Sequence, residues 1–495
     1  MENKLASTDI KRGAIKSLFW KITERGSRAF VELAVQIVMA RLLAPELFGA
    51  LAIMLVFVNI GNIFVQSGLN TALVQSPKMD DSDCSTVYWI SLTVSAVLYL
   101  CVFFTAPLIA SFYQMDAIIW PLRALALILI INAYNAVQIA LVQRELKFRI
   151  VFNAAIVSSL LSGVIGVISA VFGAELWALV LQQLSYQTCN CFVMAAQVDW
   201  QPRLVFNPKR ARELFSFGWK LLVSGVLDQG YQSLSDLIIG KQFSASSLGL
   251  VSQGKKYPQA LGTMLDGAIQ PVMLSAVSRV QDDVTYVKRL VRRALKTSTF
   301  FIVPSMTLFA VAAEPIVGIL LGAKWLPCVP FLQMYCFIYA LLPIHTTNLQ
   351  ALNGMGRSDL FLKLELIKKG YGICFILFAA FILHDVHLMV GMYMITGIIS
   401  TFVNAYPNKK VIGYSYIEQL RDIAPAFGIS AVSGIAALLC GSFVSSSPLR
   451  ILINIAVMAL VYLGVAWIFK LEAFDYLIKT VRDFLGTRRR ERHLE

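Results

Sequence analysis

Apolar runs of about 20 residues follow one another along almost the whole chain, with short polar segments between them. A helix of about 20 apolar residues crosses the roughly 30 Å hydrocarbon core of a bilayer. The pattern therefore predicts an all-α polytopic membrane protein with about 14 transmembrane helices. We expect these spans at 15–43, 48–74, 85–110, 118–142, 151–173, 175–197, 213–240, 247–275, 297–321, 328–353, 360–383, 387–406, 420–444 and 449–469.

Composition agrees with this pattern. The chain is 57% hydrophobic and only 15% charged, whereas soluble domains carry about 25% charged residues. Its eight cysteines lie mostly inside apolar runs, and none has the spacing of a metal or redox motif. We expect neither a metal nor a cofactor.

The cations follow the alternation of the spans. With the N-terminus in the cytoplasm, the cytoplasmic segments contain basic clusters such as 144–149, 203–212, 279–296 and 479–492, and the opposite side holds only Arg41, Lys241, Lys324 and Arg450. Positive charge marks cytoplasmic loops, so both termini are expected in the cytoplasm. The net charge of +14 is then an orientation signal and a set of contacts for anionic lipid, and we expect no nucleic-acid partner.

A weak internal repeat divides the chain. Trp20-Lys21 matches Trp219-Lys220, and after a shift of one residue Gly49 matches Gly249. Six spans separate the copies, so the repeat is parallel, with two six-helix lobes around a central cavity. The expected domains are an N-lobe (1–200), a basic cytoplasmic linker (201–212), a C-lobe (213–406), two accessory helices (407–470) and a basic amphipathic tail (471–495).

Charged residues form a stripe on the first span. Lys21, Glu24, Arg25, Arg28 and Glu32 fall within about 100° of arc on a helix. Charge inside a membrane is costly and marks a functional site by default. The stripe is therefore predicted to line a polar interior.

Three further spans carry polar faces. The second span has four amides within about 80° of arc, the seventh has two carboxylates and an amide on one face, and the eighth has a polar face with a lysine, a carboxylate and two amides. These residues are Asn59, Asn62, Gln66 and Asn70; Asp228, Gln232 and Asp236; and Lys255, Gln259, Asp266 and Gln270, with Lys256 adjacent to the face. The repeat makes the first two spans equivalent to the seventh and eighth, so their faces are expected to share one cavity.

Each of these groups has a structural alternative. Amides join membrane helices by hydrogen bonds, Lys21, Lys255 and Lys256 can extend to the membrane surface, and Glu24 can pair with a cation one turn away. His345 is a lone polar group that favours a structural role. The acidic run of Asp80, Asp81 and Asp83 is typical of solvated charge more than of a metal site.

Several sequence motifs point to a family. The order FW-K…AR-LLAPELFG…FVQSGL…LVQ, with QRELKFR at 143–149, LGLVSQGKKYPQ at 248–259 and LLGAKW at 320–325, resembles exporters of the MOP superfamily. Within it, the chain is similar to the polysaccharide transporter family, the Wzx-like exporters of colanic or teichuronic acid type. The specificity lies in the order and spacing of the motifs.

The resemblance implies a flippase of the bacterial inner membrane. Its substrate would be an undecaprenyl-pyrophosphate-linked oligosaccharide, and in the related lipid II flippases cations of the first and eighth spans hold the pyrophosphate. The matching candidates are Arg25, Arg28, Lys255 and Lys256. Glu24, Glu32, Asp228 and Asp236 are candidates for coupling to H⁺ or Na⁺. We expect a monomer that works beside a polysaccharide polymerase or its assembly machinery.

Other functions stay open at this stage. A multidrug antiporter of the same superfamily exports cations, but the charged stripe on the first span has three cations against two carboxylates. A polysaccharide polymerase or ligase typically carries a large external loop, and the external loops expected here are short. A scaffold for the assembly machinery would tolerate loss of the cavity charges.

Overall fold

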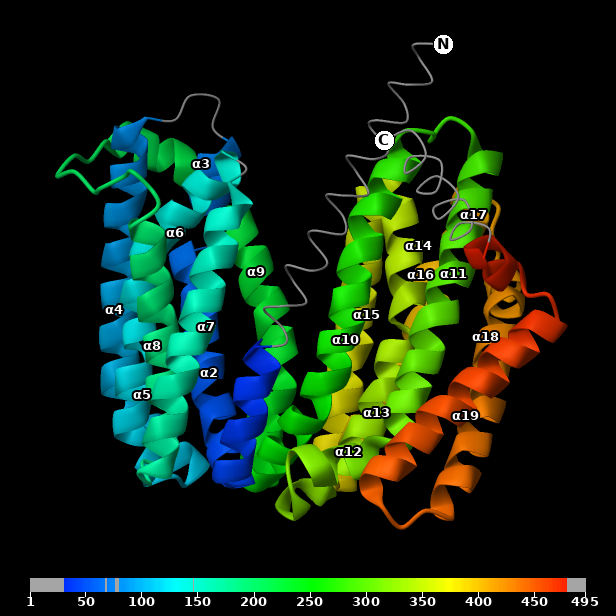
Figure 1. Cartoon of the computed structure of the whole chain (residues 1–495). Helices are drawn as coiled ribbons and strands as arrows, with labels where there is room; N and C mark the ends of the chain where they lie inside the picture. Colours follow the sequence, from blue (N-terminus) through cyan, green and yellow to red (C-terminus); the bar gives the residue numbers. More distant parts are fainter. Residues whose placement is uncertain (1–30, 67–68, 76–79, 146, 479–495) are drawn as a thin grey trace, which may run out of the picture. The chain divides into compact units, whose positions relative to one another are not determined.

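Helices account for nearly all regular structure in the computed structural model, which describes residues 31–66, 69–75, 80–145 and 147–478 (Figure 1). No β-strand occurs in these ranges. The all-α fold predicted from the apolar pattern is confirmed.

The chain divides into two compact units, 1–252 and 253–495. In the first, the helix at 31–42 is followed by α2 (Pro45–Gln66), α3 (Leu69–Gln75), α4 (Asp81–Tyr113), a 3₁₀ turn (Asp116–Ile118), α5 (Ile119–Leu125), α6 (Leu127–Arg144), α7 (Phe148–Val171), α8 (Leu176–Ala195) and α9 (Pro208–Gln242). The first turns of α10 (Ala245–Ser278) also belong to this unit.

The rest of α10 begins the second unit. It is followed by α11 (Val284–Val311), α12 (Ala313–Leu320), a 3₁₀ segment (Ala323–Cys328), α13 (Val329–Ala340), α14 (Leu342–Gly354), α15 (Ser358–Phe378), a π-helical turn (Ala379–Leu383), α16 (Val386–Ala405), α17 (Asn408–Val411), α18 (Tyr416–Ser442) and α19 (Ser447–Ile468). A further short helix covers 472–478.

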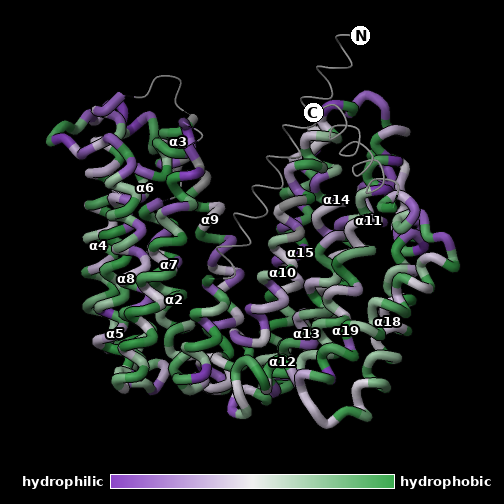
Figure 2. The backbone as a smooth tube through the Cα atoms, in the orientation of Figure 1, coloured by the Kyte–Doolittle hydropathy of each residue, from purple (hydrophilic) through white to green (hydrophobic). Residues whose placement is uncertain are grey.

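Eleven helical segments of the described ranges are long and apolar enough to span a membrane. Figure 2 shows their hydrophobic lengths in green. Two more predicted spans, 175–197 and 213–240, are present as α8 and α9, of 20 and 35 residues. The first predicted span lies mainly outside the described residues, so the count of 14 stays a prediction. The protein is a multi-pass membrane protein.

Local sequence explains where several helices begin. The Asp80 side chain accepts a hydrogen bond from the backbone N–H of Asp83 (2.8 Å) and caps α4. Asn207 caps α9 ahead of Pro208, a residue suited to the first helical turn. Ser415 and Glu418 form a reciprocal capping box at the start of α18.

In the first unit, α7 and α8 pack as an antiparallel pair, and α9 packs against α2, α3 and α4. The sequence places α9 at the start of the C-lobe, whereas contacts place it in the first unit. The proposed lobe boundaries follow the repeat, and they stay a prediction.

In the second unit, α11 packs against α18 and α19. Leu471, just before the final short helix, and Phe474 and Leu477 within it pack against a buried cluster that contains Phe300 of α11 and Tyr462 of α19. The described part of the tail therefore uses its apolar side chains to contact the protein.

Candidate functional site

The charged stripe of the first span is mostly beyond the described part of the chain. Lys21, Glu24, Arg25 and Arg28 lie outside the described residues, and Glu32 is an exposed residue of the helix at 31–42. The roles predicted for this stripe stay a prediction.

The amides predicted on the second span lie on two helices. Asn59, Asn62 and Gln66 belong to α2, while Asn70 belongs to α3. Residues 67 and 68, between these helices, lie outside the described residues, so the single arc predicted for all four amides stays a prediction. Asn59 is exposed and Asn62 is half-buried. Within the described ranges, the buried Oδ1 of Asn70 has no hydrogen-bond partner.

Asn62 has a partner on a neighbouring helix. Its Oδ1 accepts a hydrogen bond from Nδ2 of Asn132 on α6 at 2.8 Å. One turn further along α6, Nδ2 of Asn135 donates to Oδ1 of Asn190 on α8 at 3.2 Å. These bonds link α2, α6 and α8 through buried and half-buried amides, the interhelical role that the sequence left as an alternative for Asn62.

The polar face predicted on the seventh span is present on α9. Nε2 of Gln232 donates to Oδ2 of Asp228 one turn earlier at 2.8 Å. Both side chains are exposed, and Asp236 is half-buried another turn on. In the next helix, α10, Lys255 is half-buried and Lys256 is exposed.

In the second unit, sequence reasoning singled out Asp266 and His345 but missed the side chains that they contact. Thr346 on α14 donates to the Asp266 carboxylate on α10. Nδ1 of the neighbouring His345 lies 3.1 Å from Nδ2 of Asn404 on α16. The prediction that His345 is a lone polar group is wrong, because the side chain of Asn404, which lies 59 residues later in the chain on α16, contacts it.

The same unit contains an ion pair inside a membrane-length helix. Nζ of Lys368 lies 2.5 Å from Oε1 of Glu365 on α15. Tyr371 and Ser400 join α15 to α16 through their hydroxyl groups, 2.5 Å apart. The Glu-x-x-Lys spacing in an apolar run was the signal for this pair, because residues three apart are neighbours on a helix.

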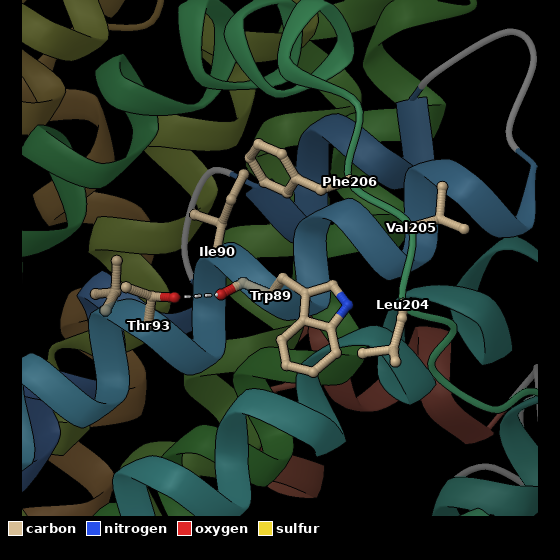
Figure 3. A pocket seen from close by; sticks show the side chains of 7 residues that line it. Trp89, Ile90, Thr93, Leu204, Val205 and Phe206 are labelled. Atoms are coloured by element: carbon tan, nitrogen blue, oxygen red, sulfur yellow. Dashed lines mark hydrogen bonds between the residues drawn. The ribbon is translucent and has the colours of Figure 1, made fainter.

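An apolar cavity of about 530 Å³ lies between α4 and the segment that precedes α9 (Figure 3). Its lining residues are Trp89, Ile90, Thr93, Val94, Leu204, Val205 and Phe206. They offer hydrocarbon and aromatic surface and no charge, so the cavity fits an apolar ligand.

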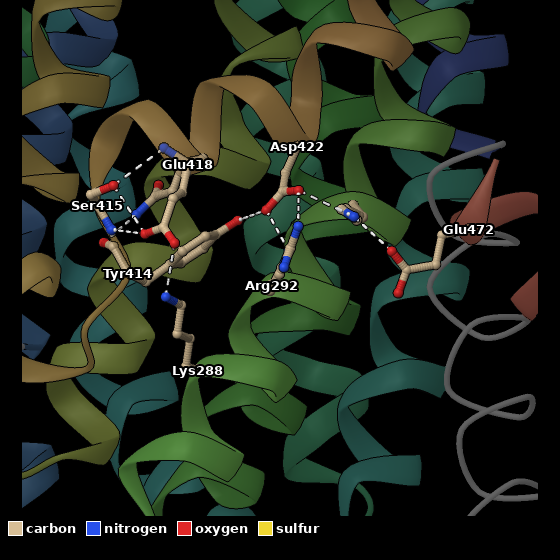
Figure 4. Close-up of polar contacts among 9 residues, drawn as sticks. Lys288, Arg292, Tyr414, Ser415, Glu418, Asp422 and Glu472 are labelled. Carbon is tan, nitrogen blue, oxygen red and sulfur yellow. Dashed lines mark hydrogen bonds and ion pairs between the residues drawn. The ribbon is translucent and has the colours of Figure 1, made fainter.

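Ion pairs join α11, α18 and the final short helix (Figure 4). Arg292 contacts Asp422 through Nε at 2.7 Å, and Nζ of Lys296 lies 3.1 Å from Asp422 and 2.6 Å from Glu472. Lys288 pairs with Glu418 at 2.9 Å. The hydrogen bond from Lys296 lowers the pKa of Glu472, whereas burial raises the pKa of Tyr414, whose hydroxyl donates to Asp422.

The polar side chains described above can bind a ligand through hydrogen bonds and charge. In the described ranges, no three His, Cys, Asp or Glu side chains come together as a metal site. The polar groups described on the spans are amides, hydroxyls, carboxylates and lysines on α2, α6, α8, α9, α10, α14, α15 and α16. Such groups bind sugars, anions or small cations.

Residues 38–330 match a family described as polysaccharide biosynthesis protein. Teichuronic acid biosynthesis protein TuaB of Bacillus subtilis is 23% identical over 81% of this chain and 84% of that protein. Succinoglycan biosynthesis transport protein ExoT of Rhizobium meliloti is 21% identical over 88% of this chain and 83% of that protein. Lipopolysaccharide biosynthesis protein WzxC of Escherichia coli is 21% identical over 79% and 80%.

Solved structures show the same fold. The inward closed conformation of the lipid II flippase MurJ superposes with a TM-score of 0.75 at 16% identity, and the match covers 90% of this chain and 98% of that chain. An inward-facing multidrug resistance transporter of the MATE family and MOP superfamily gives a TM-score of 0.55 at 15% identity, over 79% and 98%.

Proposed function

Because the chain belongs to the polysaccharide biosynthesis protein family, we propose that it is a flippase that moves lipid-linked oligosaccharides across the membrane for the assembly of a surface polysaccharide. The family match over 38–330 carries this proposal. The relatives, which include a succinoglycan biosynthesis transport protein, and a fold shared with a lipid II flippase favour a transporter over a polymerase or ligase.

The proposed substrate is an undecaprenyl-pyrophosphate carrying one oligosaccharide repeat unit. A pyrophosphate is a dense anion, and fixed Arg or Lys side chains in a low-dielectric cleft can replace its hydration. Lys21, Arg25, Arg28, Lys255 and Lys256 are the proposed contacts. The half-buried position of Lys255 supports this role, because a partly desolvated ammonium interacts more strongly with an anion than a fully hydrated one.

Sugar hydroxyls need groups that both donate and accept hydrogen bonds, as amides do. Asn59, Asn62, Gln66, Asn70 and Gln232 are proposed for this purpose. The exposed Asn59 and Gln232 and the unsatisfied oxygen of Asn70 support it. For Asn62, the hydrogen bond to Asn132 competes with a hydrogen bond to a sugar hydroxyl.

The proposed transport cycle is alternating access in the bacterial inner membrane, with both termini in the cytoplasm. An outward-moving anion is favoured by an inside-negative potential, by roughly 2.3 kcal/mol per charge per 100 mV. Glu24, Glu32, Asp228 and Asp236 are proposed to couple transport to H⁺ or Na⁺. If their Asn or Gln variants transport at the normal rate under an imposed gradient, the coupling proposal is wrong.

A complementation experiment tests the function. A strain without the gene receives the chain with Arg28→Ala, Lys255→Ala or both. We expect lipid-linked repeat units to accumulate on the inner leaflet and surface polysaccharide to disappear, at a normal level of membrane protein. Lys409→Ala, at an exposed lysine of α17, is the matched control and is expected to keep surface polysaccharide.

Normal surface polysaccharide in the double variant would remove the proposed pyrophosphate site. If the unmodified chain fails to restore polysaccharide but raises resistance to cationic drugs, the multidrug antiporter is the better assignment.

The protein is proposed to act as a monomer next to a polysaccharide polymerase.

A further inference from the structure

The backbone before α9 is tied to α4 at both ends of a short apolar stretch. Nε1 of Trp89 donates to the carbonyl oxygen of Arg203 at 2.9 Å, and the N–H of Arg203 donates to Oγ of Ser85 at 3.1 Å. Four residues later, the N–H of Asn207 donates to Oγ1 of Thr86 at 3.1 Å. The three residues between these ties are therefore held at a fixed place beside α4.

These three residues, Leu204, Val205 and Phe206, turn apolar side chains outward. Leu204 is 91% exposed, and Val205 and Phe206 are exposed as well. Leu204 and Phe206 also line the apolar cavity together with Trp89 and Ile90 of α4 (Figure 3). A loop that displays contiguous apolar side chains marks an interaction surface.

Two observations favour a lipid bilayer as the partner. Only 11% of the residues in the apolar window of α4 are fully buried inside the protein, and α4 exposes large apolar side chains such as Phe104 and Leu108, each 71% exposed. Two exposed cations, Lys209 and Arg212, lie in the first turns of α9, three and six residues after Phe206. Apolar and aromatic side chains next to cations are typical of a membrane interface with anionic lipid.

We propose that residues 204–206 form an interfacial anchor: their side chains insert among the hydrocarbon chains of the bilayer, and the cavity against Trp89 and Ile90 takes one acyl chain of an anionic phospholipid. Lys209 and Arg212 are then placed near its phosphate. The occupant is a bilayer phospholipid and not the transported lipid, because the proposed substrate contacts lie on the first span, α2, α3, α10 and the later turns of α9. The anchor fixes the segment between α8 and α9 to the membrane surface.

Fluorescence quenching in proteoliposomes tests the anchor. The full chain is prepared with Ser at the exposed and half-buried cysteines (101, 189, 191, 374 and 440) and with Leu204→Cys carrying a bimane label. Asp282→Cys, at an exposed polar loop between α10 and α11, is the matched control site. We expect brominated phosphatidylglycerol to quench the label at 204 at least twofold more than the label at 282, and aqueous iodide to do the opposite.

A second variant perturbs the surface. Phe206→Asp is expected to remove most of the difference in quenching between the labels at 204 and 282, and Phe206→Leu is expected to keep this difference. Equal quenching by iodide at 204 and 282 in the unperturbed chain would overturn the anchor, and this comparison does not depend on whether Phe206→Asp folds. Loss of the lipid quenching on addition of a few mole per cent of polyprenyl phosphate would assign the cavity to the transported lipid and overturn our choice of occupant.

Discussion

Gly49 and Gly249, which match each other in the internal repeat, meet at the crossing of α2 with the first turns of α10. A Cβ on Gly49 would lie 2.6 Å from the carbonyl carbon of Ala245, and one on Gly249 would lie 2.9 Å from the carbonyl carbon of Pro45 and 3.2 Å from the backbone nitrogen of Gly49. The contacts are reciprocal, because residue 45 precedes residue 49 by the same four positions as residue 245 precedes 249. The two copies of the repeat thus place their equivalent glycines backbone to backbone.

Gly49→Ala and Gly249→Ala are each expected to destabilise the protein, because the added methyl group meets backbone atoms and no side chain can move aside. Overpacking of this kind costs about 1–3 kcal/mol. Thermal unfolding in detergent measures the effect. Gly428→Ala on α18 is the control, since its Cβ would meet nothing within 4 Å, and a helical Gly→Ala change without a clash is neutral or favourable. Equal unfolding temperatures for all three variants would contradict the close crossing.

Asp83→Asn is expected to lower stability, because Asp83 is only 4% exposed and accepts two hydrogen bonds from the guanidinium of Arg210. Breaking a buried pair costs about 3–5 kcal/mol, and the partial exposure of Arg210 reduces this to about 1–3 kcal/mol. Asp81→Asn is the control, since that carboxylate is 56% exposed and pairs with Arg203 at the surface. We expect a clear fall in unfolding temperature and in membrane level for the first variant only. A larger loss for Asp81→Asn would show that the pair with Arg210 is not the stronger one.

Contact between the final short helix and α11 is expected to weaken in acid. The hydrogen bond from Lys296 lowers the pKa of Glu472 below its ordinary value of 4.5. A carboxylate with a lowered folded-state pKa stabilises the folded state above its unfolded-state pKa, and that stability is lost as the pH falls through the folded-state value. The side chain of Glu472 is 72% exposed, so the effect is below about 1 kcal/mol.

Unfolding temperatures measured from pH 7 down to pH 3 test this linkage. Glu472→Gln is expected to remove one component of the fall in stability below about pH 5. Asp475→Asn is the control and is expected to retain this component, because Asp475 is an exposed carboxylate that forms no ion pair among the described residues. Identical pH profiles for the unmodified chain and Glu472→Gln would exclude the pair with Lys296 as a source of pH dependence.

Hydrophobic periodicity was sufficient to predict the fold class, because each apolar run carries its own local signal, and the family was predicted from the order and spacing of sequence motifs. Partners distant in sequence carry no such signal. Asp83 looked like part of a solvated acidic run, an interpretation that is wrong because Arg210 reaches it from 127 residues away. Asn404 reaches His345 in the same way, across 59 residues.

A double-mutant cycle on Asn62 and Asn132 separates a structural role from a role in sugar binding. Their hydrogen bond and the 2% exposure of Asn132 predict a coupling energy of about 0.6 kcal/mol, the average for such bonds between membrane helices. Asn62 and Asn190 are the control pair, expected to show no coupling, because Asn190 bonds to Asn135 instead. If Asn62 only joins helices, Asn62→Ala and Asn132→Ala should reduce transport in proportion to their loss of stability. A sugar contact at Asn62 instead predicts a larger loss of transport for Asn62→Ala than for Asn132→Ala at equal stability.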